Sequence, residues 1–327
     1  MIGCYISGVL PRPKELIDAT RGYDRGRVEK ATLNAAFEQA TLKAINTQAT
    51  LGFSYVTDGM LKWQDLLRPF AENLDGVRTG GLARWFNNNT FYRKPVIVSK
   101  VQRKRTILQE LTFLNLLPKN AAWKAIVPAP YTFAELSENQ FYKNKTELMF
   151  DYAKALRQEI RDLSRIGFEY IQLSDPALVY HMTAPNSRDK LVTAREAVGV
   201  ALKGLHIKSC LHTFFGDFSR ILPEAAEFQV DDLGVDLYAT DIEKLKQHDY
   251  RKGVVLGLAD SRSSLVEDES EMVKVAKHIL SIFSSLEVNE IFVCPNCDLD
   301  FLPYDRAKEK MNAISHVTKL LQEEFGG

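Results

Sequence analysis

The chain has 327 residues with 42 basic and 42 acidic side chains, and this zero net charge gives no global electrostatic reason to expect nucleic acid or a membrane surface as a partner. No apolar run is long enough to span a bilayer, and the N-terminal stretch "MIGCYISGVLPRPKEL" lacks a basic leader and a cleavage site, which predicts a cytoplasmic protein. The cysteines Cys4, Cys210, Cys294 and Cys297 are too few for a disulfide scaffold and are expected to be thiols or metal ligands.

Short β-branched or aromatic runs alternate along the chain with longer amphipathic stretches. The strand-like runs cover residues 3–10, 52–58, 122–130, 168–175, 207–215, 233–239, 253–260 and 290–297. The helical stretches include 146–167, 268–286 and 304–325, and the first of them places Met149, Tyr152, Leu156, Ile160 and Leu163 at helical spacing. This alternation predicts parallel strands joined by crossover helices.

Eight such units closing on themselves make a (β/α)₈ barrel, and the length of the chain suits one barrel domain over residues 1–327. An open doubly wound sheet is the competing arrangement. The barrel requires all eight strands, so a single misassigned strand would favour the open sheet instead. For the barrel we expect strands that end near Gly8, Asp58, Pro128, Ser174, His212, Asp236, Asp260 and Cys294.

Residues 75–118 interrupt the alternation. This segment is rich in Gly, Asn, aromatic and basic residues and contains a strand-like run of its own, "KPVIVSK". Long excursions in compact domains are usually functional or disordered, and this one carries too many aromatic residues for a disordered linker. We therefore expect a hairpin or flap between the second and third barrel strands.

Polar side chains gather at the predicted ends of the barrel strands, which is where barrel enzymes carry their chemistry. Taken singly, each is more often a turn or capping residue than a catalytic one. The ordered set is less expected by chance, and it comprises Asp58, Ser174, Asp175, His212, Asp236, Asp260, Arg262, Cys294 and Cys297.

Three of these residues, His212, Asp236 and Cys297, offer an imidazole, a carboxylate and a thiolate. Those are zinc ligand types, and three protein ligands with an open fourth position are typical of a catalytic zinc site. Because the three are dispersed along the chain, spacing alone does not establish the site. The "CPNC" pair is also open to a redox role or to half of a four-cysteine site, although the chain has no second pair.

The excursion interleaves basic residues with aromatic ones. Arg84 and Trp85 stand beside three consecutive asparagines, and together with Lys14 they are expected to line the barrel mouth and hold a flat, anionic ligand by stacking and charge pairing. For residues 102–106 a solvated basic face is the slightly favoured alternative.

Several stretches resemble the cobalamin-independent methionine synthase family. "YIQLSDPALV" (170–179) resembles the family's Gln-Ile-Asp-Glu-Pro-Ala-Leu segment, "LHTFFGDF" (211–218) its His-x-Cys zinc segment, and "VCPNCDLDFLP" (293–303) its Pro-Asp-Cys-Gly-Leu segment. "SGVLPRPKEL" (7–16) and "ARWFNNNTFY" (83–92) also have counterparts, so the likeness covers nearly the whole chain. It implies the same barrel fold.

By this resemblance, His212 and Cys297 occupy two zinc positions and Asp236 stands where a glutamate ligand is expected. Departures are equally clear: Phe214 stands at the second cysteine ligand and Arg262 at a catalytic histidine. Three further positions that bind substrate in the family are altered, at Val9, Met60 and Ser174. In these losses the chain resembles the family's N-terminal barrel, which lacks zinc and helps to bind the folate donor.

The resemblance implies methyl transfer from a methyl-folate or related pterin to the thiol of homocysteine, with zinc activating the thiol and with Asp175, Asp260 and Arg262 as catalytic residues. Asp58 and Ser174 are expected to bind substrate with Lys14, Arg84 and Trp85. The alternative is a non-catalytic donor-binding barrel that acts with a separate zinc-bearing subunit. Alkyl transfer to another small thiol is a third possibility.

Overall fold

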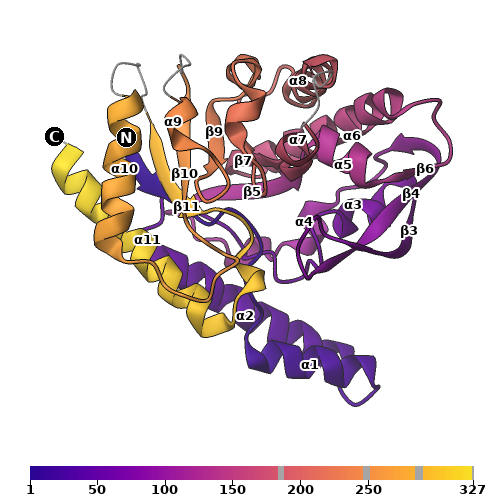
Figure 1. Ribbon diagram of the computed structural model, residues 1–327. Helices are drawn as coiled ribbons and strands as arrows, with labels where there is room; N and C mark the ends of the chain where they lie inside the picture. Colours follow the sequence, from indigo (N-terminus) through magenta and orange to yellow (C-terminus); the bar gives the residue numbers. More distant parts are fainter. Residues whose placement is uncertain (183–187, 246–250, 284–289, 326–327) are drawn as a thin grey trace.

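The structure is a computed structural model that describes residues 1–182, 188–245, 251–283 and 290–325. Its main sheet has eight parallel strands in the order β1-β11-β10-β9-β8-β7-β5-β2. They are β1 (Ile2–Cys4), β2 (Tyr55–Val56), β5 (Ala122–Pro128), β7 (Phe168–Ser174), β8 (Lys208–His212), β9 (Asp232–Asp236), β10 (Gly253–Ala259) and β11 (Ile291–Pro295). Ser54, next to β2, donates its N–H to the carbonyl of Cys4 at 2.8 Å, so the sheet closes on itself. The predicted (β/α)₈ barrel is confirmed (Figure 1).

Helices cover the outside of the barrel, and α1 projects away from it beside the first part of α2 (Figure 1). The helices are α1 (Lys14–Asp24), α2 (Lys30–Thr50), α3 (Arg68–Asn73), α4 (Leu108–Leu111), α5 (Pro130–Leu136), α6 (Lys145–Arg165), α7 (Pro176–His181), α8 (Arg188–Leu202), α9 (Ile242–Leu245), α10 (Glu269–Phe283) and α11 (Tyr304–Phe325). Short 3-10 helices lie at Leu114–Leu116, Phe218–Ile221, Glu224–Glu227 and Leu299–Phe301. Among the helices in the described ranges, none is both long and apolar enough to cross a membrane.

Helix α6 shows why the helices of this protein can be predicted from the sequence pattern. The side chain of Asn144 caps the helix by accepting the N–H of Glu147 at 3.0 Å. All five apolar residues predicted for its inner face are buried. The predicted helix 268–286 begins at Glu269 in the structure, and residues 284–286 of that prediction lie outside the described ranges.

Four strands, β5, β7, β8 and β9, end at the predicted residues, and β10 and β11 end within one residue of them. The prediction for the first strand is wrong, because β1 ends at Cys4 rather than near Gly8. Beyond it, the hydroxyl of Ser7 donates to the carbonyls of Pro295 at 2.7 Å and Cys297 at 3.1 Å. Side-chain hydrogen bonds therefore replace the backbone ladder where the segment passes the end of β11.

The excursion is a hairpin, as predicted. Its strands β3 (Asp75–Arg84) and β4 (Phe91–Gln102) pair antiparallel, and the short β6 (Glu138–Asn139) adds to β4. The expectation of a solvated basic face is wrong for Arg103. Its side chain is only 8% exposed and pairs with Glu159 and, at 2.8 Å, with Asp162 on α6. Arg103 thus anchors the hairpin to the barrel.

Polar side chains fill part of the barrel interior. The ammonium group of Lys124 donates to the carbonyl of Ile6 at 2.9 Å and lies 3.2 Å from the ring centroid of Tyr5. Burial lowers the pKa of Lys124 to about 7. The hydroxyl of Tyr170 donates to Asp232 at 2.6 Å, and Cys210 packs beside it as a buried thiol. With this layer occupied, chemistry is confined to the end of the barrel where the strands terminate.

Candidate functional site

Asn296, directly after β11, connects the ends of three neighbouring strands. Its side-chain amide donates to Asp236 at 3.0 Å and to Asp260 at 3.2 Å, and its Oδ1 accepts the N–H of Ser261 at 2.9 Å. Its backbone carbonyl lies 3.1 Å from Nε2 of His212. Because a carbonyl only accepts hydrogen bonds, Nε2 carries the proton in this arrangement. The predicted residues His212, Asp236 and Asp260 are thus brought together by a residue that the sequence did not single out.

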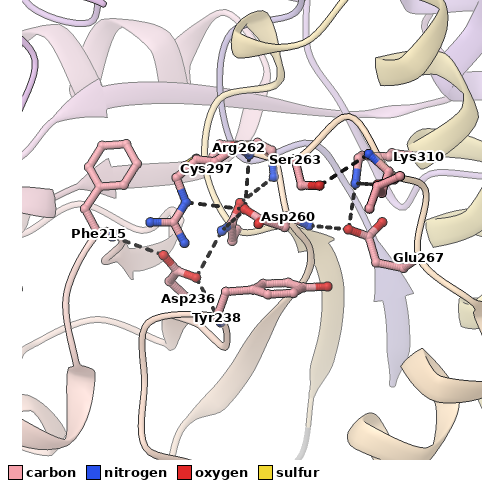
Figure 2. A network of polar contacts seen from close by, with 12 residues as sticks. Phe215, Asp236, Tyr238, Asp260, Arg262, Ser263, Glu267, Cys297 and Lys310 are labelled. Carbon is pink, nitrogen blue, oxygen red and sulfur yellow. Dashed lines mark hydrogen bonds and ion pairs between the residues drawn. The ribbon is translucent and has the colours of Figure 1, made fainter. Parts of the chain in front are cut away.

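Arg262 lies at the exposed rim of this network (Figure 2). Its backbone N–H and its Nε both donate to Oδ1 of Asp260, at 3.1 Å and 3.3 Å, and its guanidinium carbon is 5.9 Å from the ring centroid of Phe215. Burial lowers the pKa of Arg262, but the carboxylates of Asp236 and Asp260 outweigh this effect and leave the pKa raised. The predicted catalytic residues Asp260 and Arg262 therefore form an ion pair in which the guanidinium of Arg262 stays charged.

A buried ion pair holds the loop that carries this unit. Oε1 of Glu267 accepts the N–H of Asp260 at 2.8 Å and the ammonium group of Lys310 at 2.6 Å (Figure 2). The side chain of Lys310 is fully buried on α11. Helix α11 thereby fixes the backbone position of Asp260.

His212 and Cys297 are both uncharged in this environment. Burial lowers the pKa of His212 to about 3. Nδ1 of His212 packs closely against Gly234, because a Cβ added to that glycine would lie only 2.1 Å from Nδ1. Burial raises the pKa of Cys297 well above its usual value, and the charges of Asp298 and Asp236 add to this effect. The imidazole is therefore neutral and the thiol protonated near pH 7.

The three residues predicted to bind zinc do not fit the ion as they are arranged. Nε2 of His212 donates to the carbonyl of Asn296, and Nδ1, which is buried without a hydrogen-bond partner among the described residues, is the ring nitrogen left for an ion. Both carboxylate oxygens of Asp236 accept backbone N–H groups, from Phe215 and Tyr238 at 3.1 Å each. Phe214 is buried and supplies no ligand. Within the described ranges, no three His, Cys, Asp or Glu side chains are grouped to hold a metal. The zinc role of His212, Asp236 and Cys297 stays a prediction.

Asp175 lies beside His212 at the end of β7. Its N–H donates to the carbonyl of His212 at 2.8 Å, and its Oδ1 accepts the hydroxyl of Thr132 at 2.6 Å. Its Oδ2 is buried without a hydrogen-bond partner among the described residues. Burial raises the pKa of Asp175 to about 7, so the carboxyl is partly protonated near neutral pH. Ser174 is also buried and accepts a hydrogen bond from Gln172 at 3.0 Å.

The predicted ligand cradle is brought together only in part. Trp85 is buried and lines a pocket of about 290 Å³ whose wall includes the carboxylates of Asp65, Asp298 and Asp300. The described lining includes no basic side chain, in contrast to the cradle expected for an anionic donor. Lys14 and Arg84 are exposed and do not line this pocket.

Asp58 serves a turn in the described structure. Its Oδ1 accepts the N–H of Met60 at 2.8 Å, and it takes no part in the hydrogen bonds around Asn296. The substrate-binding roles of Asp58, Lys14 and Arg84 therefore stay predictions.

A closed parallel barrel with interacting polar residues at the carboxyl ends of its strands has the architecture of a barrel enzyme. The chain belongs to the cobalamin-independent synthase family, because the family's catalytic-domain sequence model matches residues 4–320. It is 30% identical over 324 residues to a methionine synthase of Saccharolobus solfataricus, covering 98% of this chain and 95% of that protein. A methionine synthase of Sulfurisphaera tokodaii is 30% identical over 322 residues, covering 98% and 92%.

Solved structures support the fold. A B12-independent methionine synthase from Shewanella sp. W3-18-1, in complex with selenomethionine, superimposes with a TM-score of 0.82 at 19% identity and 98% coverage of both chains. A methyltransferase from Methanosarcina mazei gives a TM-score of 0.62 at 13% identity, covering 96% of this chain and 94% of that one. At these identities the comparison concerns the barrel fold alone.

Sequence reasoning missed Asn296, Thr132 and the Glu267–Lys310 pair. Asn296 carried a usable signal, since it stands between Pro295 and Cys297 where the resembling family segment has an aspartate. Thr132 and Lys310 are polar residues within helices, and polar residues there are usually exposed to solvent. Their burial depends on contacts across 43 residues in each case, and local patterns do not encode such contacts.

Proposed function

We propose that the protein is a methyltransferase that makes methionine by moving a methyl group from a methyl-folate or related pterin to the thiol of homocysteine. The observation that carries the proposal is the family match over residues 4–320, together with relatives of similar length named methionine synthase. The site around Asn296 lies where a barrel enzyme binds substrate. The cytoplasmic location expected from the sequence stays a prediction.

The reaction requires two proton movements. The thiol of homocysteine loses its proton to solvent, and the sulfur electron pair forms a bond to the methyl carbon. The donor nitrogen keeps the electron pair of the broken C–N bond and takes up a proton. Asp175, whose pKa of about 7 suits proton exchange near neutral pH, is the group we assign to the second movement. Asp260 and Arg262 are assigned to substrate positioning.

The direct test is methionine formation by the purified chain, supplied with homocysteine and a methyl-tetrahydropterin donor. We expect methionine to accumulate with the chain as the sole protein. Donor binding without methionine formation would contradict the proposal.

A second candidate is a donor-binding barrel that acts with a separate catalytic subunit. The specific observation that favours it is Phe214, which stands at a position where the family has a zinc ligand and whose ring centroid lies 5.8 Å from that of His212. This candidate predicts methionine formation only after a second, zinc-bearing protein is added.

Zinc titration into the metal-free chain bears on both candidates. We expect no tight stoichiometric binding, because the described residues group no three ligand side chains for a metal and the ion would have to ionise the buried thiol of Cys297. Calorimetry with and without homocysteine measures this, and Cys297→Ser is the matched control. Tight one-to-one binding that is lost in Cys297→Ser would contradict the expectation and restore the zinc site.

A further inference from the structure

A substrate carboxylate that enters this end of the barrel needs hydrogen-bond donors, and most of the local donors are already engaged by the chain itself. Four backbone N–H groups at or near the strand ends donate to internal carboxylate or amide oxygens at 2.9–3.1 Å. They belong to Val9, paired with Asp298, to Phe215 and Tyr238, paired with Asp236, and to Ser261, paired with Asn296. The backbone here therefore offers a ligand none of these four donors.

Arg262 is different, because its donors remain open. Its Nη1 and Nη2 have no hydrogen-bond acceptor among the described residues, and its side chain is 35% exposed. Its Nε is held by Asp260 at 3.3 Å, which fixes the direction of the guanidinium plane (Figure 2). Two parallel N–H groups on a fixed, permanently charged plane match the two oxygens of a carboxylate.

Asp260 offers the complementary group beside it. Its Oδ1 takes the hydrogen bonds from Arg262 and Asn296, whereas its Oδ2 accepts none from the described residues. Its side chain is 19% exposed. A free carboxylate oxygen next to an open guanidinium presents one negative and one positive contact, as the zwitterionic end of an α-amino acid requires.

We propose that the Arg262–Asp260 pair binds the α-amino acid end of the methyl acceptor. The two Nη groups of Arg262 hold the carboxylate, and Oδ2 of Asp260 accepts the ammonium group. The inference rests on the proposed function for the identity of the acceptor, and it makes Arg262 the residue that selects an amino-acid thiol over a simple thiol.

Calorimetry with three thiols tests the pairing. L-homocysteine carries both charged groups, 4-sulfanylbutanoate lacks the amino group, and 3-aminopropane-1-thiol lacks the carboxylate. We expect Arg262→Met to weaken binding of the two thiols that carry a carboxylate, L-homocysteine and 4-sulfanylbutanoate, about 10- to 100-fold. Binding of 3-aminopropane-1-thiol should stay nearly unchanged. Arg262→Lys, which keeps the charge without the planar fork, should fall between the wild type and Arg262→Met.

Arg165→Met is the control, since Arg165 lies at the end of α6, opposite the site, with a 71% exposed side chain. Thermal denaturation checks that all variants fold. Equal loss for all three thiols, or no loss for homocysteine, would overturn the inference while leaving the proposed methyl transfer intact. Failure of wild type to bind homocysteine would overturn both. Binding that depends on Arg262 without any methionine formation would support the inference and remove the proposed activity.

Discussion

Replacing Lys310 with methionine should destabilise the barrel by about 3 to 5 kcal/mol, because the change leaves the carboxylate of Glu267 in a largely buried position without its cation. The ammonium group of Lys310 donates to Glu267 at 2.6 Å and also to the carbonyl of Leu265, so one side chain holds two points of the loop that carries Asp260 and Arg262. Urea denaturation measures the loss. Activity measured well below the unfolding transition should also fall, since Glu267 positions the backbone of Asp260.

Lys274→Met is the matched control for this prediction. Lys274 pairs with Glu271 on α10, but both side chains are more than 60% exposed, so its removal should lower the free energy of unfolding far less than the removal of Lys310 does. The double variant Lys310→Met/Glu267→Gln should recover part of the stability, because the unpaired charge is then absent. Similar losses for the two lysine variants would show that burial of the Lys310–Glu267 pair is unimportant.

Asp175→Asn should change how stability depends on pH. Burial raises the pKa of Asp175 to about 7 in the folded protein, whereas an aspartate in an unfolded chain titrates near 3.9. Between these values the folded state binds more protons than the unfolded state, so this group lowers the free energy of unfolding as pH rises from about 4 to about 7. Over the whole window the effect is on the order of a few kcal/mol.

The asparagine variant does not titrate and should lack this component. Compared with wild type, it should therefore be relatively more stable at pH 8 than at pH 4.5. Asn can still accept the hydrogen bond from Thr132, so the variant differs from wild type mainly in the loss of the titratable group. Urea denaturation at the two pH values measures the difference, with the exposed Asp189→Asn as control. Parallel pH profiles for wild type and Asp175→Asn would show that Asp175 is not the group responsible.

Much of the barrel could be predicted because its strands and helices follow local periodicity. Strand β7 is a short run rich in aromatic and branched apolar residues that ends at Ser174, and α6 repeats its apolar residues at helical spacing, so each element carries its own signal. The first strand could not be predicted in this way. Its apolar run continues beyond Cys4, but there the side chain of Ser7 forms hydrogen bonds to Pro295, the last residue of β11, and to Cys297 beyond it.

The sequence was sufficient to predict which residues form the candidate site, but not which hydrogen bonds they make. The ends of parallel strands meet at one end of a barrel, so His212, Asp236 and Asp260 were expected to be near one another. Which atom bonds which is decided by Asn296, whose amide and carbonyl contact all three from the neighbouring strand. Those bonds fix Nε2 of His212 and the carboxylate of Asp236 in contacts within the chain, and residue types alone do not indicate such contacts.

Transfer of an isotopically labelled methyl group is the measurement that tests the central claim most directly. The purified chain, in excess over a methyl-deuterated tetrahydropterin donor, is mixed with homocysteine, and the product is analysed by mass spectrometry. We predict deuterated methionine, formed with no other protein present. A label that remains on the bound donor, and moves to homocysteine only when a second protein is added, would contradict the assignment of the methyl transfer to this chain.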